Sequence, residues 1–163
     1  LLHTAGEKLA AKIKRRDNDK VLVLIADAHS PKAQYLVEGL QKTLGGKFPI
    51  TGGCANKNAG QTFVYFGGKM YRDSALALML SGDFKVSLSG RKAQDNDAVI
   101  STARDGAREA LDKSTGKPVA VLAFNCAGRR GQLVDHPLDA EVQQHLSEVE
   151  VDELGLHHAG TIR

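Results

Sequence analysis

Residues 21–44 read VLVLIADAHSPKAQYLVEGLQKTL, and this stretch decides the fold. Its first six residues are all apolar and partly β-branched, which is typical of a strand covered on both faces. In the turn that follows, Ser30 can cap a helix and Pro31 suits the first helical position. Leucines then recur at every fourth position, namely Leu36, Leu40 and Leu44. A glycine pair ends this pattern, so the stretch predicts a strand followed by a helix.

The segments on either side extend this unit. Upstream, residues 6–16 predict an amphipathic helix whose basic residues gather toward its end, where the helix dipole favours cations. We expect these residues to form a solvated face, with an anionic partner as the alternative. Downstream, a short strand at residues 49–51 precedes four more, at residues 62–66, 69–71, 75–81 and 84–89. Their close spacing and glycine-containing turns predict an antiparallel meander.

The last part of the chain resembles the first, because it also has an apolar strand-like run followed by a polar loop. Residues 96–113 show helical spacing, and residues 119–124, VAVLAF, form a second apolar run of the buried-strand type. A polar loop follows this run, and residues 139–149 predict a further helix. We therefore expect an α/β fold with a mixed β-sheet, in which helix-flanked buried strands are combined with an antiparallel meander.

Composition and charge exclude several classes of protein. The chain has 163 residues, of which 42% are hydrophobic and 25% charged, as in an ordinary soluble domain. No run of apolar residues approaches the roughly 18 needed for a transmembrane helix, so we expect no membrane partner. The net charge of +3 is too small to indicate nucleic-acid binding. Aromatic residues make up only 5%, with no Trp, so stacking platforms for single strands are not expected either.

The cysteines favour a reducing compartment. Cys54 and Cys126 lie far apart and form no CxxC pair, so a cytoplasmic location is expected, although one disulfide stays open. The chain begins with Leu1 rather than Met, and no apolar signal segment follows. We expect it to be a fragment or to lack terminal residues.

Two loops that follow predicted strands are the candidate binding sites, because ligands of α/β proteins bind beyond the carboxyl ends of strands. The first loop is TGGCANKNAG, residues 51–60, whose glycines allow a close backbone approach and an anion-binding nest of N–H groups. Its candidate ligand-binding residues are Gly52, Gly53, Cys54 and Asn56. The alternative is a tight turn between strands. The loop lacks the GKS or GKT ending of a phosphate-binding loop.

The second loop is NCAGRRG, residues 125–131. Either arginine is suited to bind a carboxylate or a phosphate in a bidentate manner. The candidate ligand-binding residues here are Asn125, Cys126, Gly128, Arg129 and Arg130. The alternatives are a surface turn with solvated arginines and a buried thiol that acts as a small hydrophobe.

Catalysis is the weaker hypothesis. Cys126 is a potential nucleophile if Arg129 or a helix N-terminus lowers its pKa, but no histidine is paired with it in the sequence. His29 lies beside Asp27 and Ser30, and we interpret this group as a turn and helix cap rather than a triad. No metal-ligand spacing such as HExxH is present.

At these two loops the sequence resembles the FIST family of sensory domains. The stretch PITGGCANKNAGQTFVYFGGKMYRDSALALMLSGDFKV, residues 49–86, is similar to the end of the family's N-terminal half, and FNCAGRR, residues 124–130, is similar to the hallmark of its C-terminal half. We therefore expect an N-terminal-like half at residues 1–87 and a C-terminal-like half at residues 88–163. The family has a sizeable segment between the halves. Near residues 86–88 either residues are missing or the protein is naturally short.

The resemblance implies a ligand-sensing module and not an enzyme. It implies a small ligand, such as an amino acid or another anionic metabolite, held between the two loops with the arginines as anchors. It also implies a signalling partner such as a histidine kinase or a cyclase-type output domain. One alternative is a haem-based nitric oxide sensor, as in a subset of relatives, with His136 as the axial ligand. Others are an enzyme that uses Cys126 and a docking module without a small ligand.

Overall fold

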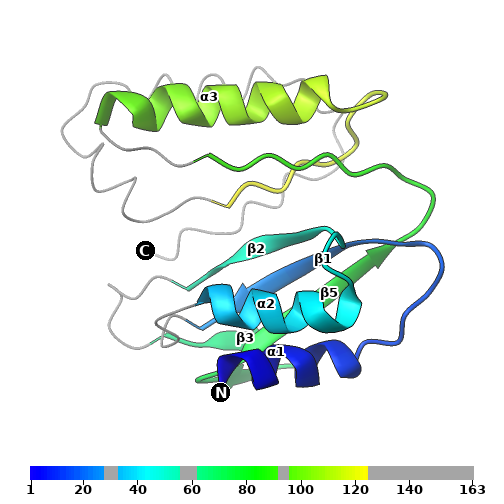
Figure 1. Cartoon of the computed structure of the whole chain (residues 1–163). Helices are drawn as coiled ribbons and strands as arrows, with labels where there is room; N and C mark the ends of the chain where they lie inside the picture. Colours follow the sequence, from blue (N-terminus) through cyan, green and yellow to red (C-terminus); the bar gives the residue numbers. More distant parts are fainter. Residues whose placement is uncertain (28–32, 56–61, 92–95, 125–163) are drawn as a thin grey trace. The chain divides into compact units, whose positions relative to one another are not determined.

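The computed structural model describes residues 1–27, 33–55, 62–91 and 96–124, and the chain divides into two compact units, Leu1–Val86 and Ser87–Arg163 (Figure 1). The first unit contains helices α1 and α2 and strands β1 to β5, and the second contains helix α3. The elements are α1 (Leu2–Ala11), β1 (Asp19–Ala26), α2 (Ala33–Leu44), β2 (Ile50–Cys54), β3 (Val64–Phe66), β4 (Lys69–Tyr71), β5 (Ala75–Ser81) and α3 (Asn96–Asp112).

The main sheet of the first unit has three strands in the order β2-β1-β5. Strand β1 is parallel to β2, with register pairs from Leu22↔Ile50 to Ala26↔Cys54. It is antiparallel to β5, with Ala26 opposite Ala75 at one end. The apolar run that opens the decisive stretch is thus the central strand, because it is the segment best suited to burial. The predicted α/β fold with a mixed sheet is confirmed.

One face of this sheet packs against α1 and α2 and forms the core. The buried cluster consists of Ala10, Leu22, Leu24, Ala26, Leu36, Leu40 and Leu44. Alternate residues of β1 meet the predicted leucine stripe of α2, so two periodicities, of two and of about four residues, converge on one face. Burial of these side chains from water supplies the main stabilisation of the unit.

Helices α1 and α2 approach each other through glycines. A Cβ atom on Gly6 would lie 2.2 Å from the Leu36 carbonyl oxygen, and one on Gly39 would lie 2.1 Å from the His3 carbonyl oxygen. The two helix backbones are therefore in direct contact, which any larger side chain at these positions would prevent.

The antiparallel part is smaller than the predicted meander. Strands β3 and β4 form a separate hairpin around Gly67 and Gly68, both of which have positive φ angles, 58° and 80°. Strand β5 pairs instead with β1, and residues 84–89 form no strand. The apolar strand β5 gains more burial beside the central strand than it would at the end of a short hairpin.

The bounds of helix α1 differ from the predicted residues 6–16, whereas the end of α2 agrees with the prediction. Helix α1 ends at Ala11, so most of the basic residues predicted to lie on the helix follow it, in the connection to β1. The Gly45 stop of α2 is confirmed: its φ angle is 107°, and its N–H donates to the Gln41 carbonyl at 2.9 Å.

In the second unit, α3 lies close to its predicted position, residues 96–113, but the predicted strand at residues 119–124 is wrong. These residues are irregular and exposed, with Val119 at 78% and Leu122 at 56%. No strand among the described residues pairs with them, and an apolar run without a hydrogen-bonding neighbour does not form a strand. The helix predicted at residues 139–149 lies outside the described residues.

Charges in the second unit gather around Glu109 on α3. Its carboxylate forms ion pairs with Arg91 and with Lys113, and Ser89 contributes a hydrogen bond at 3.4 Å. These contacts hold the pKa of Glu109 below its usual value, the hydrogen bond from Lys113 being the largest cause. They tie residues 89–91 to the helix. None of the helices in the described part of the chain is long and apolar enough to cross a membrane.

Candidate functional site

The candidate site lies where the two parallel strands of the main sheet end together. Ala26 at the end of β1 is the register partner of Cys54 at the end of β2, and the Ala55 N–H donates to the Ala26 carbonyl at 2.9 Å. The next residue of the first strand is Asp27, which is buried, with only 2% of its surface exposed. We call this region, Asp27 with residues 53–55, the carboxyl edge. Such an edge is where α/β proteins bind ligands.

The Asp27 carboxylate is held by donors from distant segments. The Thr62 hydroxyl donates a hydrogen bond to Oδ1, and the Asp73 N–H donates to Oδ2 at 2.8 Å. The backbone N–H of Asp27 donates to the Ser74 carbonyl at 2.9 Å. Thr62 is itself buried, at 5% exposure. The carboxylate thus fastens the end of β1 to the segment before β3 and to the turn between β4 and β5.

The turn that meets Asp27 has an unusual backbone. Asp73 has a φ angle of 48° and is the one residue other than glycine recorded with a positive φ in the described part of the chain. Asp and Asn adopt this left-handed conformation more readily than other residues with side chains. In this conformation Asp73 presents its N–H to the carboxylate of Asp27.

Cys54 is the titratable group beside Asp27 at the carboxyl edge. The residue is exposed, and its thiol is free. Partial burial of the sulfur raises the thiol pKa above its usual value, and the negative charge of Asp27 raises it further. The thiol is therefore protonated at neutral pH. It provides a neutral, polarisable contact and lacks the lowered pKa of a nucleophilic cysteine.

The two glycines of the first predicted loop have different positions. Both belong to strand β2, which runs to Cys54 and is longer than the predicted strand at residues 49–51. Gly52 has a φ angle of 141°, and a Cβ atom there would lie 1.8 Å from the Leu24 carbonyl oxygen. The close approach of the neighbouring strand therefore accounts for Gly52. Gly53 is exposed next to Cys54, where a ligand has access to the backbone.

The structure brings Gly53 and Cys54 to the carboxyl edge and places Gly52 inside strand β2 against Leu24, whereas the remaining predicted site residues lie outside the described residues. These are Asn56 in the first loop, the candidates of the second loop (Asn125, Cys126, Gly128, Arg129 and Arg130) and the haem candidate His136. Their roles stay predictions, as does the position of His29 in the turn after β1.

Asp27, Thr62 and Asp73 are the functional candidates that sequence reasoning missed as a group. From the sequence we interpret Asp27 as part of a turn, Thr62 as the start of a strand, and Asp73 as the end of a turn in the stretch that resembles the FIST family. The signal available in the sequence was a lone acidic residue directly after a buried apolar run. Its partners lie 35 and 46 residues away, so only the folded chain connects them.

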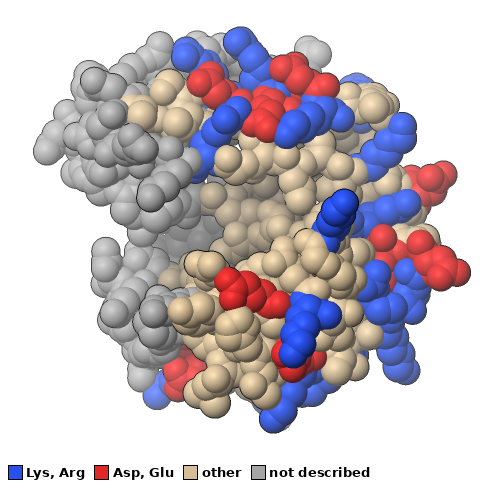
Figure 2. All heavy atoms as spheres, viewed as in Figure 1, with Lys and Arg blue, Asp and Glu red and all other residues tan. Residues whose placement is uncertain are grey.

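The described residues offer no metal site. Among them no group of three or more His, Cys, Asp and Glu side chains is arranged to hold a metal ion. His3, the histidine in the described part of the chain, lies 3.3 Å from a Glu38 carboxylate oxygen and has its ring 5.0 Å from that of Tyr35. It therefore belongs to the contact between α1 and α2. Over the face drawn in Figure 2, basic and acidic side chains lie interspersed.

Comparison with known proteins gives one match. No curated protein and no solved structure matches the chain. Among protein families, the FIST N domain matches residues 2–108. The match contains every strand of the main sheet and the hairpin, and it continues past residue 87, where we placed the end of the N-terminal-like half. The assignment of the remainder to a C-terminal-like half stays a prediction. Because the match covers more than half of the chain, this protein belongs to the FIST family, a family of sensory and signalling domains.

Proposed function

We propose that this domain binds a small ligand at the carboxyl edge and relays its presence to a signalling partner. The observation that carries the proposal is the buried Asp27, placed directly beyond a central parallel strand and fastened to two distant segments. A buried carboxylate is costly unless hydrogen bonds or a paired charge compensate it, and the Thr62 hydroxyl and the Asp73 N–H supply such bonds to Asp27. Membership in a sensory family supports the same conclusion.

The charge at this edge favours an amino acid over a purely anionic metabolite. Burial is the larger cause of the raised pKa of Cys54, and the negative charge of Asp27 is the second, so the field of this carboxylate extends to the exposed surface beside Gly53. An ammonium group is attracted by this field and a carboxylate is repelled by it. The backbone of the exposed edge is suited to the carboxylate of the same ligand. The ligand is therefore a zwitterion, with its ammonium group next to Cys54.

The hydrogen bonds of Asp27 connect the carboxyl edge to the exposed hairpin. They join the carboxyl edge to the turn after β4, so a ligand that moves the edge also moves the hairpin. The hairpin exposes large apolar side chains: Tyr65 at 63%, Phe66 at 64% and Met70 at 64%. Exposed apolar groups of this size are typical of surfaces that bind other proteins. The hairpin is therefore a surface suited to a partner such as a histidine kinase or a cyclase-type domain.

A ligand screen with a matched pair of variants tests the binding site. The twenty common amino acids are tested by thermal shift and calorimetry, each hit against its analogue without the amino group. We expect one class of amino acid to raise the melting temperature and its deaminated analogue to fail. Cys54→Arg places a cation at the exposed edge and abolishes the response. Thr43→Arg, the same added charge on the exposed surface of α2, retains it.

Two results would contradict the proposal. One is the absence of any response across the panel, and the other is an affinity that Cys54→Arg leaves unchanged.

A further inference from the structure

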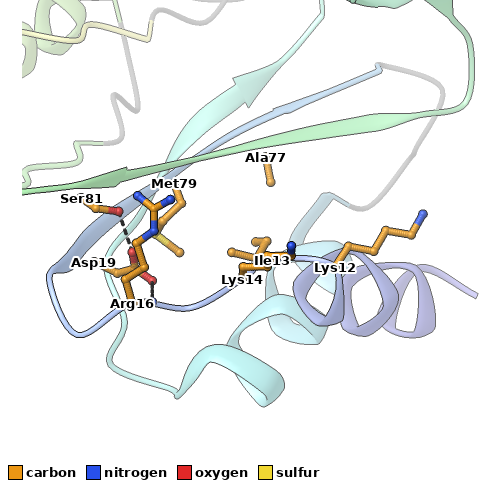
Figure 3. Close-up of a pocket in the computed structure, with 8 residues that line it drawn as sticks. All are labelled: Lys12, Ile13, Lys14, Arg16, Asp19, Ala77, Met79 and Ser81. Atoms are coloured by element: carbon orange, nitrogen blue, oxygen red, sulfur yellow. Dashed lines mark hydrogen bonds between the residues drawn. The ribbon is translucent and has the colours of Figure 1, made fainter.

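A cavity of about 300 Å³ lies at the end of the central strand opposite the carboxyl edge (Figure 3). One wall includes Asp19, the first residue of β1, whereas Asp27 follows the last residue of that strand. The seven residue steps of the strand separate the two regions by about 23 Å. The cavity is thus independent of the carboxyl edge, and the inference drawn from it does not rest on the proposed function.

The cavity combines an apolar floor with a basic wall. Its floor is formed by Ala77 and Met79 of β5, with Ile13 from the segment after α1. Its basic residues are Lys12, Lys14 and Arg16. In Figure 3 the Arg16 side chain reaches toward Met79 and Ser81, whereas the Lys12 side chain extends away from them. An apolar surface with a few polar groups is the usual composition of a small-molecule site.

The acidic residue of the cavity is already engaged. Arg15 Nε donates to Asp19 Oδ2 at 3.0 Å, the Arg16 backbone N–H donates to the same oxygen at 2.9 Å, and the Ser81 hydroxyl donates to Oδ1 at 2.6 Å. Arg15 also donates to the Leu44 carbonyl at 3.2 Å, and its guanidinium lies 4.5 Å from the centre of the Phe48 ring. The negative charge of Asp19 is therefore paired with Arg15, which also contacts Leu44 and Phe48 and so stabilises the fold.

The remaining cations have no such partner. Within the part of the chain that the structure describes, the side chains of Lys12, Lys14 and Arg16 take part in no ion pair. The Lys14 and Arg16 side chains line the same small space, where their positive charges repel each other. A monocarboxylate offsets one of them, whereas a phosphate monoester carries a charge of about −1.5 to −2 at neutral pH. Arg is also suited to bind phosphate oxygens in a bidentate manner.

We infer that this cavity binds a small phosphate ester, with Arg16 and Lys14 holding the phosphate and with Met79 and Ile13 contacting a short apolar group. The volume sets the size of the ligand, because about 300 Å³ is at the lower limit for small-molecule sites. Phenyl phosphate has the required charge and a single apolar ring, so it is the probe. Benzoate carries one negative charge on the same ring, and inorganic phosphate lacks the ring.

Methionine methyl resonances give a direct readout. The chain has two methionines. Met79 lines the cavity, and Met70 lies on the hairpin, outside it. In protein labelled at the methionine methyl carbons, we expect phenyl phosphate to shift the Met79 resonance in a saturable manner and to leave Met70 unchanged. Benzoate and inorganic phosphate should bind more weakly than phenyl phosphate.

Substitutions separate the site from the overall charge. Arg16→Gln should weaken phenyl phosphate binding about tenfold, as expected for the loss of a charged hydrogen-bonding partner. The variant should fold, because the Arg16 backbone, rather than its side chain, holds Asp19. Lys14→Gln should weaken binding in the same direction. Lys47→Gln removes one positive charge from an exposed residue that does not line the cavity, and it should leave binding unchanged.

Four outcomes would overturn the inference: no saturable Met79 shift, equal shifts of both methionines, equal weakening by Lys47→Gln, or benzoate binding as tightly as phenyl phosphate. Vesicles of phosphatidylcholine with phosphatidic acid separate a lipid headgroup from a free ester. Sedimentation of the protein with these vesicles, together with no response to phenyl phosphate, would also contradict a small soluble ligand.

Discussion

At the scale of single residues, the Asp27 carboxylate depends on donors that the fold delivers from far along the chain. The Thr62 hydroxyl is one of these donors, and both residues are buried. We expect Thr62→Val, which keeps the shape and removes the hydroxyl, to lower the free energy of unfolding by about 1–3 kcal/mol. Thr62→Ser should recover most of the loss. Urea unfolding measures both, and a Thr62→Val variant as stable as the parent would contradict this role.

The reactivity of the Cys54 thiol depends on the charge of Asp27. Because burial and the Asp27 charge raise its thiol pKa above the ordinary value of 9.0, less thiolate is present at any pH below that value than in an unstructured peptide. In a Cys126→Ser background, alkylation by iodoacetamide should therefore be slower than that of a peptide thiol, with its rise displaced to higher pH. Asp27→Asn should move the profile part of the way back. A profile displaced to lower pH would refute the assignment.

At the scale of elements, the contact between α1 and α2 decides whether a Gly→Ala substitution stabilises or destabilises the protein. Ala in place of Gly inside a helix is favourable by about 1 kcal/mol in isolation. At Gly39 the added methyl group would meet the His3 carbonyl. We expect the clash to dominate, so Gly39→Ala should destabilise the protein by about 1–3 kcal/mol. Gly46→Ala, where nothing lies within 4 Å, is the control and should be nearly neutral in thermal unfolding.

The connection between α1 and β1 is held by Asp19, which makes stability depend on pH. Hydrogen bonds from Ser81 first, then from the Arg16 backbone and Arg15, lower the pKa of Asp19 below its ordinary value of 3.8. A lowered folded-state pKa stabilises the protein above the unfolded-state pKa, and this contribution is lost as the pH falls through the folded-state value. Ser81→Ala should thus be less stable than the parent at neutral pH.

The difference between Ser81→Ala and the parent should narrow as the pH drops below 3.8, because Asp19 becomes protonated in both proteins. Unfolding midpoints measured from pH 7 to pH 2 follow this difference. A constant difference across that range would show that the Asp19 charge is not involved.

At the scale of the whole molecule, the division into two units predicts a fragment that folds by itself. Every residue of the buried cluster lies in the unit Leu1–Val86, as do the main sheet and the hairpin. A chain of this length can bury enough apolar surface for marginal stability. We expect a fragment of residues 1–86 to unfold cooperatively in urea. A fragment without a cooperative transition would show that the core requires the second unit.

Local patterns of the sequence determined the first β-α unit, the hairpin turn, the class of the fold and the resemblance to the FIST family. Spacing of apolar residues and the positions of glycines express secondary structure directly, because both depend on neighbours a few residues away. The leucine stripe of α2 and the turn at Gly67 were therefore predictable. The family match over residues 2–108 contains the first β-α unit and the hairpin turn, whereas FNCAGRR at residues 124–130 lies outside it.

Tertiary structure alone decided which partners each segment takes. Strand β5 pairs with β1 and not with the hairpin, and residues 119–124 have no neighbouring strand among the described residues. Asp27 accepts hydrogen bonds from residues 35 and 46 positions away. The cavity at Asp19 likewise arises from segments that are distant in sequence. Segments that are remote in sequence can pair with the same strand or cover the same apolar surface. A local sequence pattern does not show which of them does so.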